Sequence, residues 1–256
     1  MEAHGYRPFE SIFYLLSDMN NVTFDVVIFG DNEFYPYTPT LEELSKYKAL
    51  ILPNATCLSD EQVNLLLEYV NQGGVLIGVG KIGICNENGF PVKRENFTCY
   101  FNATGYPGEG GSVEIYEYGN GTMVSITGEF SYHYYSNRRD LYLCIPELID
   151  PYLPPEEREN IWYQCYYESI GWMIQWFSNI LSNVGVQLDV TTNLNPYVMN
   201  IKYWDPSTST TLFHFINYLY DWEFNDTAID QLNVNFTFTL RPELQGKSLR
   251  ITYYTP

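Results

Sequence analysis

Seven asparagines in this chain stand two positions before a threonine, which is the acceptor pattern for N-linked glycans. They are Asn21, Asn54, Asn96, Asn102, Asn120, Asn225 and Asn235. Chance pairing of the chain's asparagines with Ser and Thr would give roughly three such triplets. Because glycans of this kind are added outside the cytosol, the excess predicts an extracellular or cell-surface glycoprotein.

Two of these asparagines fall where the local pattern predicts exposure. Asn120 lies at an Asn-Gly turn inside Val113–Ile126, which is typical of a β-hairpin. In Val234–Leu240 the apolar residues alternate with polar ones, so Asn235 is expected on the solvent face of a strand.

The five cysteines are the second group able to do chemistry. In an extracellular chain, four of the five cysteines are expected to form two disulfides, and the fifth is left without a partner in this chain. Closing the shortest loops pairs Cys85 with Cys99 and Cys144 with Cys165, leaving Cys57. Other pairings stay open.

Cys85 is also a candidate nucleophile, because a catalytic Cys in an α/β fold lies on a sharp turn between a strand and a helix. Here Asn86-Glu87-Asn88-Gly89 follows Cys85 in place of a helix. The turn after the expected strand Val75–Gly78 contains Gly80 and Lys81 and has no Cys or Ser. The sequence therefore predicts that a hydrolytic role has been lost.

The remaining candidates point to structure rather than catalysis. The three histidines, His4, His133 and His214, show no metal-ligand spacing. The acidic pairs Glu42–Glu43 and Glu156–Glu157 lie at expected helix starts, where the helix dipole favours negative charge. No metal or cofactor is expected.

The elements that would position these residues alternate between helix and strand in the first part of the chain, which indicates an α/β layered domain with a mainly parallel sheet. Capping boxes at Thr40–Glu43 and Ser59–Gln62 predict two helix starts. Expected helices are 11–20, the segment after Thr40, and 63–72; expected strands are 24–29, 49–52 and 75–78. A loop-rich excursion, 81–111, follows and carries three of the acceptor triplets.

The second half predicts one long helix and then strands. Pro154–Pro155 precede apolar residues at helical spacing over 156–182. Beyond Gly185 the expected elements are short strands at 186–190, 197–204, 210–218, 234–240 and 249–254. This change predicts an α/β domain over 1–185 and a small all-β sandwich domain over 186–256.

The charge and composition of the chain argue against some classes of binding partner. A net charge of −18, with 13 Lys and Arg against 31 Asp and Glu, disfavours nucleic acid and anionic lipid. No apolar run reaches the length of a membrane span. The first ten residues do not have the pattern of a signal peptide, so we expect a mature product or a piece of a longer precursor.

Three stretches together resemble a known family. Tyr47–Asn54, Leu58–Gln62 and Leu66–Ile77 look like the trimerisation module of family-42 β-galactosidases, which has a class I glutamine-amidotransferase-like, flavodoxin-like fold. The segment 118–128 resembles the strand pair that closes such modules, and 211–218 with the later strands resembles the C-terminal β domain of those and related glycosidases. The catalytic barrel of the family precedes this region, so no catalytic residue carries over.

The resemblance implies an extracellular accessory or assembly region of a glycoside-hydrolase-like protein that does not itself break bonds. Its expected partners are further copies of the chain, a catalytic barrel of the same parent, or carbohydrate. A cell-surface or filament structural glycoprotein is the first alternative. A hydrolase or transferase with a site in the α/β domain is the second.

Overall fold

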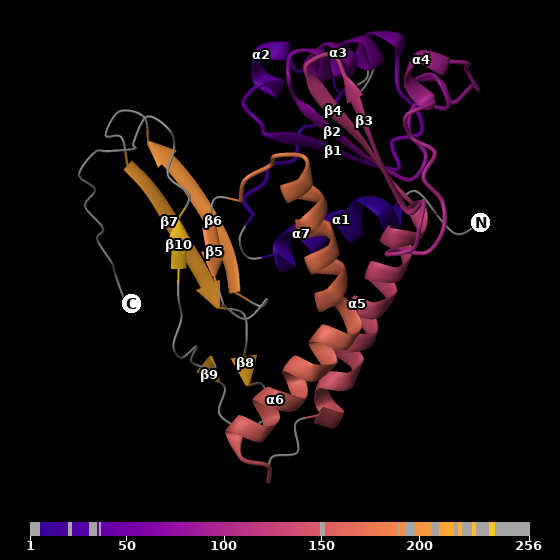
Figure 1. The fold of residues 1–256 in the computed structure, drawn as a ribbon. Helices are drawn as coiled ribbons and strands as arrows, with labels where there is room; N and C mark the ends of the chain where they lie inside the picture. The colour runs from indigo at the N-terminus through magenta and orange to yellow at the C-terminus, as the bar shows by residue number, and fades with distance from the viewer. Residues whose placement is uncertain are drawn as a thin grey trace.

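The computed structural model describes residues 6–19, 22–30, 35, 37–148 and 152–188, together with the short stretches 190–192, 198–205, 210–217, 220–221, 227–228 and 236–238. Its centre is a four-stranded sheet in the order β1-β2-β4-β3 (Figure 1). The strands are β1 (Ala49–Pro53), β2 (Val75–Val79), β3 (Val113–Tyr118) and β4 (Gly121–Ile126). β1, β2 and β4 run parallel, and β3 pairs antiparallel with β4 at the edge.

The strands form because their residues suit a sheet covered on both faces. Every residue of β2 is buried, and such a continuous apolar run is typical of a central parallel strand. The β3–β4 hairpin turns through Gly119–Asn120, since Tyr118 pairs with Gly121. The predicted hairpin over 113–126 is confirmed.

One set of helices covers one face of the sheet. These are α2 (Leu41–Leu44), α3 (Asp60–Asn71) and α4 (Glu95–Thr98) (Figure 1). Both predicted capping boxes are present, with Thr40 and Ser59 as the capping residues. Leu66, Leu76 and Met123 lie in the core beneath these helices.

The opposite face is covered by α1 (Tyr6–Asp18), α5 (Gly128–Leu148) and α7 (Trp172–Asn183) (Figure 1). Leu15, Ile77, Val124 and Phe177 belong to this second core. Because alternate residues of β2 and β4 enter the two cores, the described part of the chain has three layers, helix, sheet and helix. This arrangement confirms the predicted α/β class with a mainly parallel sheet.

No helix was predicted from the sequence over Gly128–Leu148, the segment that forms α5. In the structure Phe130, Tyr134 and Leu141 are buried on one side of the helix. Tyrosine has a modest intrinsic helix propensity, so tertiary packing and not local preference makes this segment helical.

The long helix predicted over 156–182 is confirmed, with one irregularity. Helix α6 (Pro155–Tyr166) continues into a π-helical turn, η1 (Tyr167–Gly171), and then into α7. A π-turn rotates the residues that follow it relative to a regular helix and is often a built-in feature. The α1 helix begins earlier than expected, at Tyr6.

The predicted strand 24–29 is wrong. Residues 22–30 are irregular, and Val26 and Ile28 are exposed. This apolar run pairs with no strand among the described residues. Its partly buried Phe24 packs against the core under α1, α5 and α7, and Val27 and Phe29 pack against the core on the other face of the sheet.

After residue 189 the described elements are all strands: β5 (Val190–Thr192), β6 (Val198–Asp205), β7 (Thr210–Asn217), β8 (Tyr220–Asp221), β9 (Thr227–Ala228) and β10 (Phe236–Phe238). They form three two-stranded antiparallel pairs, β5 with β10, β6 with β7 and β8 with β9. The β6–β7 hairpin agrees with the predicted strands 197–204 and 210–218. The sandwich as a whole and the domain boundary stay predictions, and the strand 249–254 lies outside the described residues.

Candidate functional site

The carboxyl ends of β1, β2 and β4 meet at one edge of the sheet. Pro53 pairs with Val79, and Val79 pairs with Ile126, so the chain leaves all three strands at the same level. In open α/β sheets, ligands bind in the crevice outside this edge. The residues just after these strands therefore form the candidate site.

Gly80 occupies the turn after β2, at the carboxyl edge of the sheet. Its φ is +83°, a conformation that favours glycine. The Gly80 N–H donates to the Ile126 carbonyl at 2.9 Å, and the Asn54 N–H donates to the Val79 carbonyl at 2.8 Å. The turn is thus held to both neighbouring strands.

A side chain at position 80 would meet its neighbours closely. A Cβ added to Gly80 would lie 3.2 Å from Asn54 Oδ1 and 3.5 Å from the Cα of Gly128. Asn54, itself at φ +50°, accepts a hydrogen bond from the Lys81 N–H at 3.2 Å. A side chain at position 80 would therefore press on the Asn54 side chain and touch the start of α5.

The start of α5 carries a histidine and a glutamate on neighbouring turns. Glu129 and His133 lie 3.7 Å apart between Oε2 and Nε2. The Thr127 hydroxyl accepts a hydrogen bond from the Glu129 N–H at 3.3 Å, which secures the first turn of the helix. A carboxylate that orients a histidine is part of many acid–base sites, so this pair is the strongest catalytic candidate at the edge.

The surroundings of His133 are aromatic. Its ring centroid lies 4.5 Å from that of Tyr106 and 5.5 Å from that of Tyr132, and Tyr106 stacks in turn on Trp172. His133 therefore has a carboxylate and two phenol rings beside it. A hydrolase of the Cys–His or Ser–His kind needs a thiol or aliphatic hydroxyl in that place.

Cys85 lies in the loop after β2, away from any helix start. It forms isolated β-bridges with Cys57 on one side and Pro91 on the other. Desolvation and the neighbouring Cys57 thiol raise the pKa of Cys85. Because the thiolate is the reactive form, this environment does not activate Cys85 as a nucleophile.

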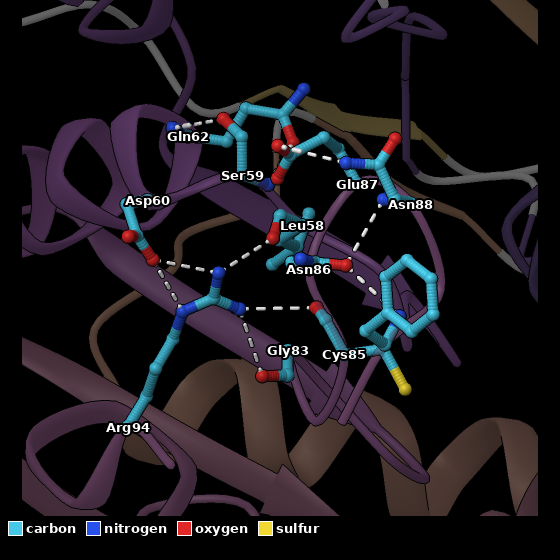
Figure 2. Close-up of polar contacts among 11 residues, drawn as sticks. Leu58, Ser59, Asp60, Gln62, Gly83, Cys85, Asn86, Glu87, Asn88 and Arg94 are labelled. Carbon is cyan, nitrogen blue, oxygen red and sulfur yellow. Dashed lines mark hydrogen bonds and ion pairs between the residues drawn. The ribbon is translucent and has the colours of Figure 1, made fainter. Parts of the chain in front are cut away.

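The Arg94 guanidinium, which is buried, holds the same loop (Figure 2). It donates to the carbonyl oxygens of Leu58 at 2.8 Å, Gly83 at 3.1 Å and Cys85 at 3.1 Å. Its Nε also donates to the Asp60 carboxylate at 2.8 Å. One side chain thus joins the loop after β2 to the segment before α3. Nothing in the local sequence around Arg94 indicates these partners, which lie 9 to 36 positions away.

Two solved structures are similar to this chain. One is a catalytic mutant of Gan42B, a GH42 beta-galactosidase from G. stearothermophilus, at 14% sequence identity and a TM-score of 0.47. The other is Gan42B, also a GH42 beta-galactosidase, at 14% identity and a TM-score of 0.46. Each match covers 80% of this chain and 30% of the other, so this chain spans about a third of the length of those proteins. No protein-family model matches the chain, and neither does any curated protein.

The acceptor asparagines that the structure describes lie at or near the surface. Asn96, Asn102 and Asn120 are exposed, and Asn54 is half-buried. Asn120 is in the turn of the β3–β4 hairpin, but this turn consists of Gly119 and Asn120, one position before the predicted Asn-Gly pair, and Gly121 begins β4. Asn21, Asn225 and Asn235 lie outside the described residues. Glycosylation of all seven stays a prediction.

The cysteine pairs predicted from spacing are not tested. Cys57, Cys85 and Cys99 are thiols in the structure, with Cys57 and Cys99 exposed. The side chain of Cys144 lies outside the described residues, so its predicted disulfide with Cys165 stays a prediction. The pairing of Cys85 with Cys99 stays a prediction, with Cys57 as a competing partner for Cys85.

Among the described residues, no group of three or more His, Cys, Asp or Glu side chains could hold a metal ion. Within the same part of the chain, no helix has the length and apolar character needed to cross a membrane.

Proposed function

We propose that this chain is an extracellular, N-glycosylated accessory or assembly region of a glycoside-hydrolase-like protein, and that it contributes contacts instead of bond breaking. The Gly80 turn is the observation that carries the proposal. A residue without a side chain stands where the fold would present a nucleophile, and Asn54 and Gly128 occupy the neighbouring space.

The chemistry around the turn supports the same conclusion. His133 is paired with Glu129 and packed against phenol rings, and these groups are not the thiol or aliphatic hydroxyl that a histidine base activates in Cys–His and Ser–His hydrolases. Desolvation and the neighbouring Cys57 thiol raise the pKa of Cys85, which disfavours the reactive thiolate.

The extracellular part of the proposal rests on the acceptor triplets. Three of the four that the structure describes have exposed asparagines, as an enzyme that transfers a bulky oligosaccharide requires. We expect most of the seven sites to carry glycans when the protein is made in its native source. Intact mass before and after enzymatic deglycosylation measures this, and an unmodified mass would contradict secretion.

The non-catalytic part is tested by assaying the purified chain on chromogenic glycosides and amides. We expect no turnover above the buffer rate. Glu129→Gln, His133→Ala and Cys85→Ala serve as site variants, with Glu117→Gln, an exposed residue of β3, as the matched control. If the wild type and the Glu117→Gln control turn over a substrate and any site variant does not, the hydrolase alternative is established.

The assembly part is supported by large aromatic side chains left exposed on the described surface, including Phe90, Tyr152 and Tyr167. Aromatic residues are enriched where proteins meet partners. We expect the chain to self-associate or to bind a barrel domain of the same parent, as mass measured by light scattering over a concentration series would show. A strictly monomeric chain with no binding to the parent would favour a surface or filament glycoprotein instead.

A further inference from the structure

Cys57 and Cys85 face each other across a short backbone ladder. The Cys85 N–H donates to the Thr56 carbonyl at 2.9 Å, and the Leu58 N–H donates to the Cys85 carbonyl at 3.1 Å. These two bonds make Cys57 and Cys85 directly opposed partners of a parallel bridge. Opposed residues of neighbouring strands lie about 5 Å apart, which falls inside the Cα separation of natural disulfides.

The two side chains are also neighbours, since the Cys57 thiol is among the groups that raise the pKa of Cys85. Cys57 is exposed and Cys85 is half-buried, so an oxidant in solution can reach the first sulfur and the second lies beside it. Cys99, by contrast, follows α4 and has Tyr116 as a neighbour.

The segments that carry the two cysteines are held in place without a covalent bond. Arg94 donates to the carbonyl oxygens of Leu58 and Cys85, one from each segment, and the Cys85 sulfur points away from the guanidinium (Figure 2). The Gly83 N–H also donates to the Ala55 carbonyl at 2.8 Å. The Cα separation of a bridged pair already lies in the range of natural disulfides, so the two segments do not have to approach each other for the bond to form.

We propose that Cys57 and Cys85 are the paired cysteines of this loop and form a disulfide on exposure to a small-molecule disulfide such as oxidised glutathione. The exposed Cys57 sulfur attacks the glutathione disulfide, forms a mixed disulfide and releases one glutathione. The Cys85 sulfur then attacks the Cys57 sulfur and releases the second. Both thiol protons pass to the two glutathione leaving groups, and the two electrons removed from the protein reduce glutathione disulfide.

The Cys57–Cys85 pair takes the place of the Cys85–Cys99 pair predicted from the sequence. The proposal does not depend on the proposed assembly role, because it concerns only the thiol chemistry of the folded chain. The bond would close a loop of roughly thirty residues. A loop of that size raises the midpoint of thermal unfolding by roughly 5–10 °C in a chain of this length.

The test equilibrates the purified full chain in a glutathione redox buffer, alkylates free thiols and maps the peptides by mass spectrometry. We expect a Cys57–Cys85 cross-linked peptide in the wild type and in the Cys99→Ser variant. Cys57→Ser and Cys85→Ser should each lose it. A Cys85–Cys99 peptide, or alkylated Cys57 and Cys85 after equilibration with excess oxidised glutathione, would overturn the proposal.

A second measurement does not rely on peptide recovery. Adding a reductant should lower the thermal midpoint of the oxidised wild type and of oxidised Cys99→Ser by at least the roughly 5–10 °C that the Cys57–Cys85 bond contributes. In Cys57→Ser, which cannot form this bond, the drop in the midpoint should be roughly 5–10 °C smaller. An equal shift in all three proteins would show that the stabilising bond involves other cysteines and would overturn the assignment.

Discussion

Asp18 and Arg138 join two helices through a bidentate ion pair. The Arg138 Nε lies 2.6 Å from one oxygen of the Asp18 carboxylate, and its Nη2 lies 3.2 Å from the other. The buried Tyr134 hydroxyl donates to the same carboxylate at 2.7 Å. Since Asp18 ends α1 and Arg138 belongs to α5, the pair ties together two of the helices that cover one face of the sheet.

Removing the cation should destabilise the protein. In Arg138→Met the Asp18 carboxylate, which is 8% exposed, loses its counterion, and we expect the free energy of unfolding at pH 7 to fall by about 3 kcal/mol. Arg139→Met is the matched control, because Arg139 pairs with Asp140 at the exposed surface, where such pairs contribute less than about 1 kcal/mol. Urea unfolding of the two variants measures the difference, and equal losses would contradict the role of the buried pair.

The charge of Asp18 should also set a pH dependence. Burial raises the pKa of Asp18 above its ordinary value, and the Arg138 and Tyr134 contacts offset this in part. A carboxyl with a raised pKa in the folded state contributes stability that is fully present below the unfolded pKa and is lost as pH rises through the folded pKa. The wild type should therefore lose stability relative to Asp18→Asn between about pH 4 and the folded pKa.

Urea unfolding of wild type and Asp18→Asn over a pH series checks this slope. Asp140→Asn, at the exposed pair with Arg139, is the control and should show little pH-dependent difference. A wild type that gains stability over Asp18→Asn as pH rises would mean that the ion pair outweighs burial.

A methyl group at Gly80 should be costly for two reasons. Gly80 and Gly89 share nearly the same positive φ, +83° and +80°, but a Cβ on Gly89 would meet nothing within 4 Å. Gly89→Ala therefore isolates the backbone cost, about 1–2 kcal/mol. Gly80→Ala adds the contact with Asn54 and should exceed it by about 1 kcal/mol. Denaturant unfolding compares them, and similar values would mean that the turn can relax around a side chain.

The Arg94 contacts predict that lysine cannot replace arginine there. A lysine ammonium is a compact charge and cannot span Asp60 and three carbonyl groups as a planar guanidinium does. We expect Arg94→Lys to lower the free energy of unfolding by about 2 kcal/mol and to speed amide exchange at Leu58 and Cys85. Lys93→Met, at an exposed neighbour, should change neither. Unchanged exchange in Arg94→Lys would contradict the role of the guanidinium in holding the loop.

Features that depend on neighbours in sequence could be predicted well. The capping boxes at Thr40 and Ser59 involve residues three apart, so the same chemistry is visible in the sequence and in the structure. The β3–β4 hairpin follows from its turn and the strand β2 from its apolar run. Helix α5 could not be predicted in this way, because its aromatic residues favour helix only when Phe130 and Tyr134 are buried against the sheet and α7.

By itself the sequence determined the acceptor triplets, the helix starts, the α/β class and the glycine in the turn after β2, since each depends on residue type and short spacing. The tertiary structure alone decided that Asp18 meets Arg138, that Arg94 meets Leu58 and Asp60, and that Cys57 faces Cys85. These partners are 28 to 120 positions apart in the chain. Contacts over such separations depend on the order of strands in the sheet and on the layer each helix occupies, which residue spacing does not encode.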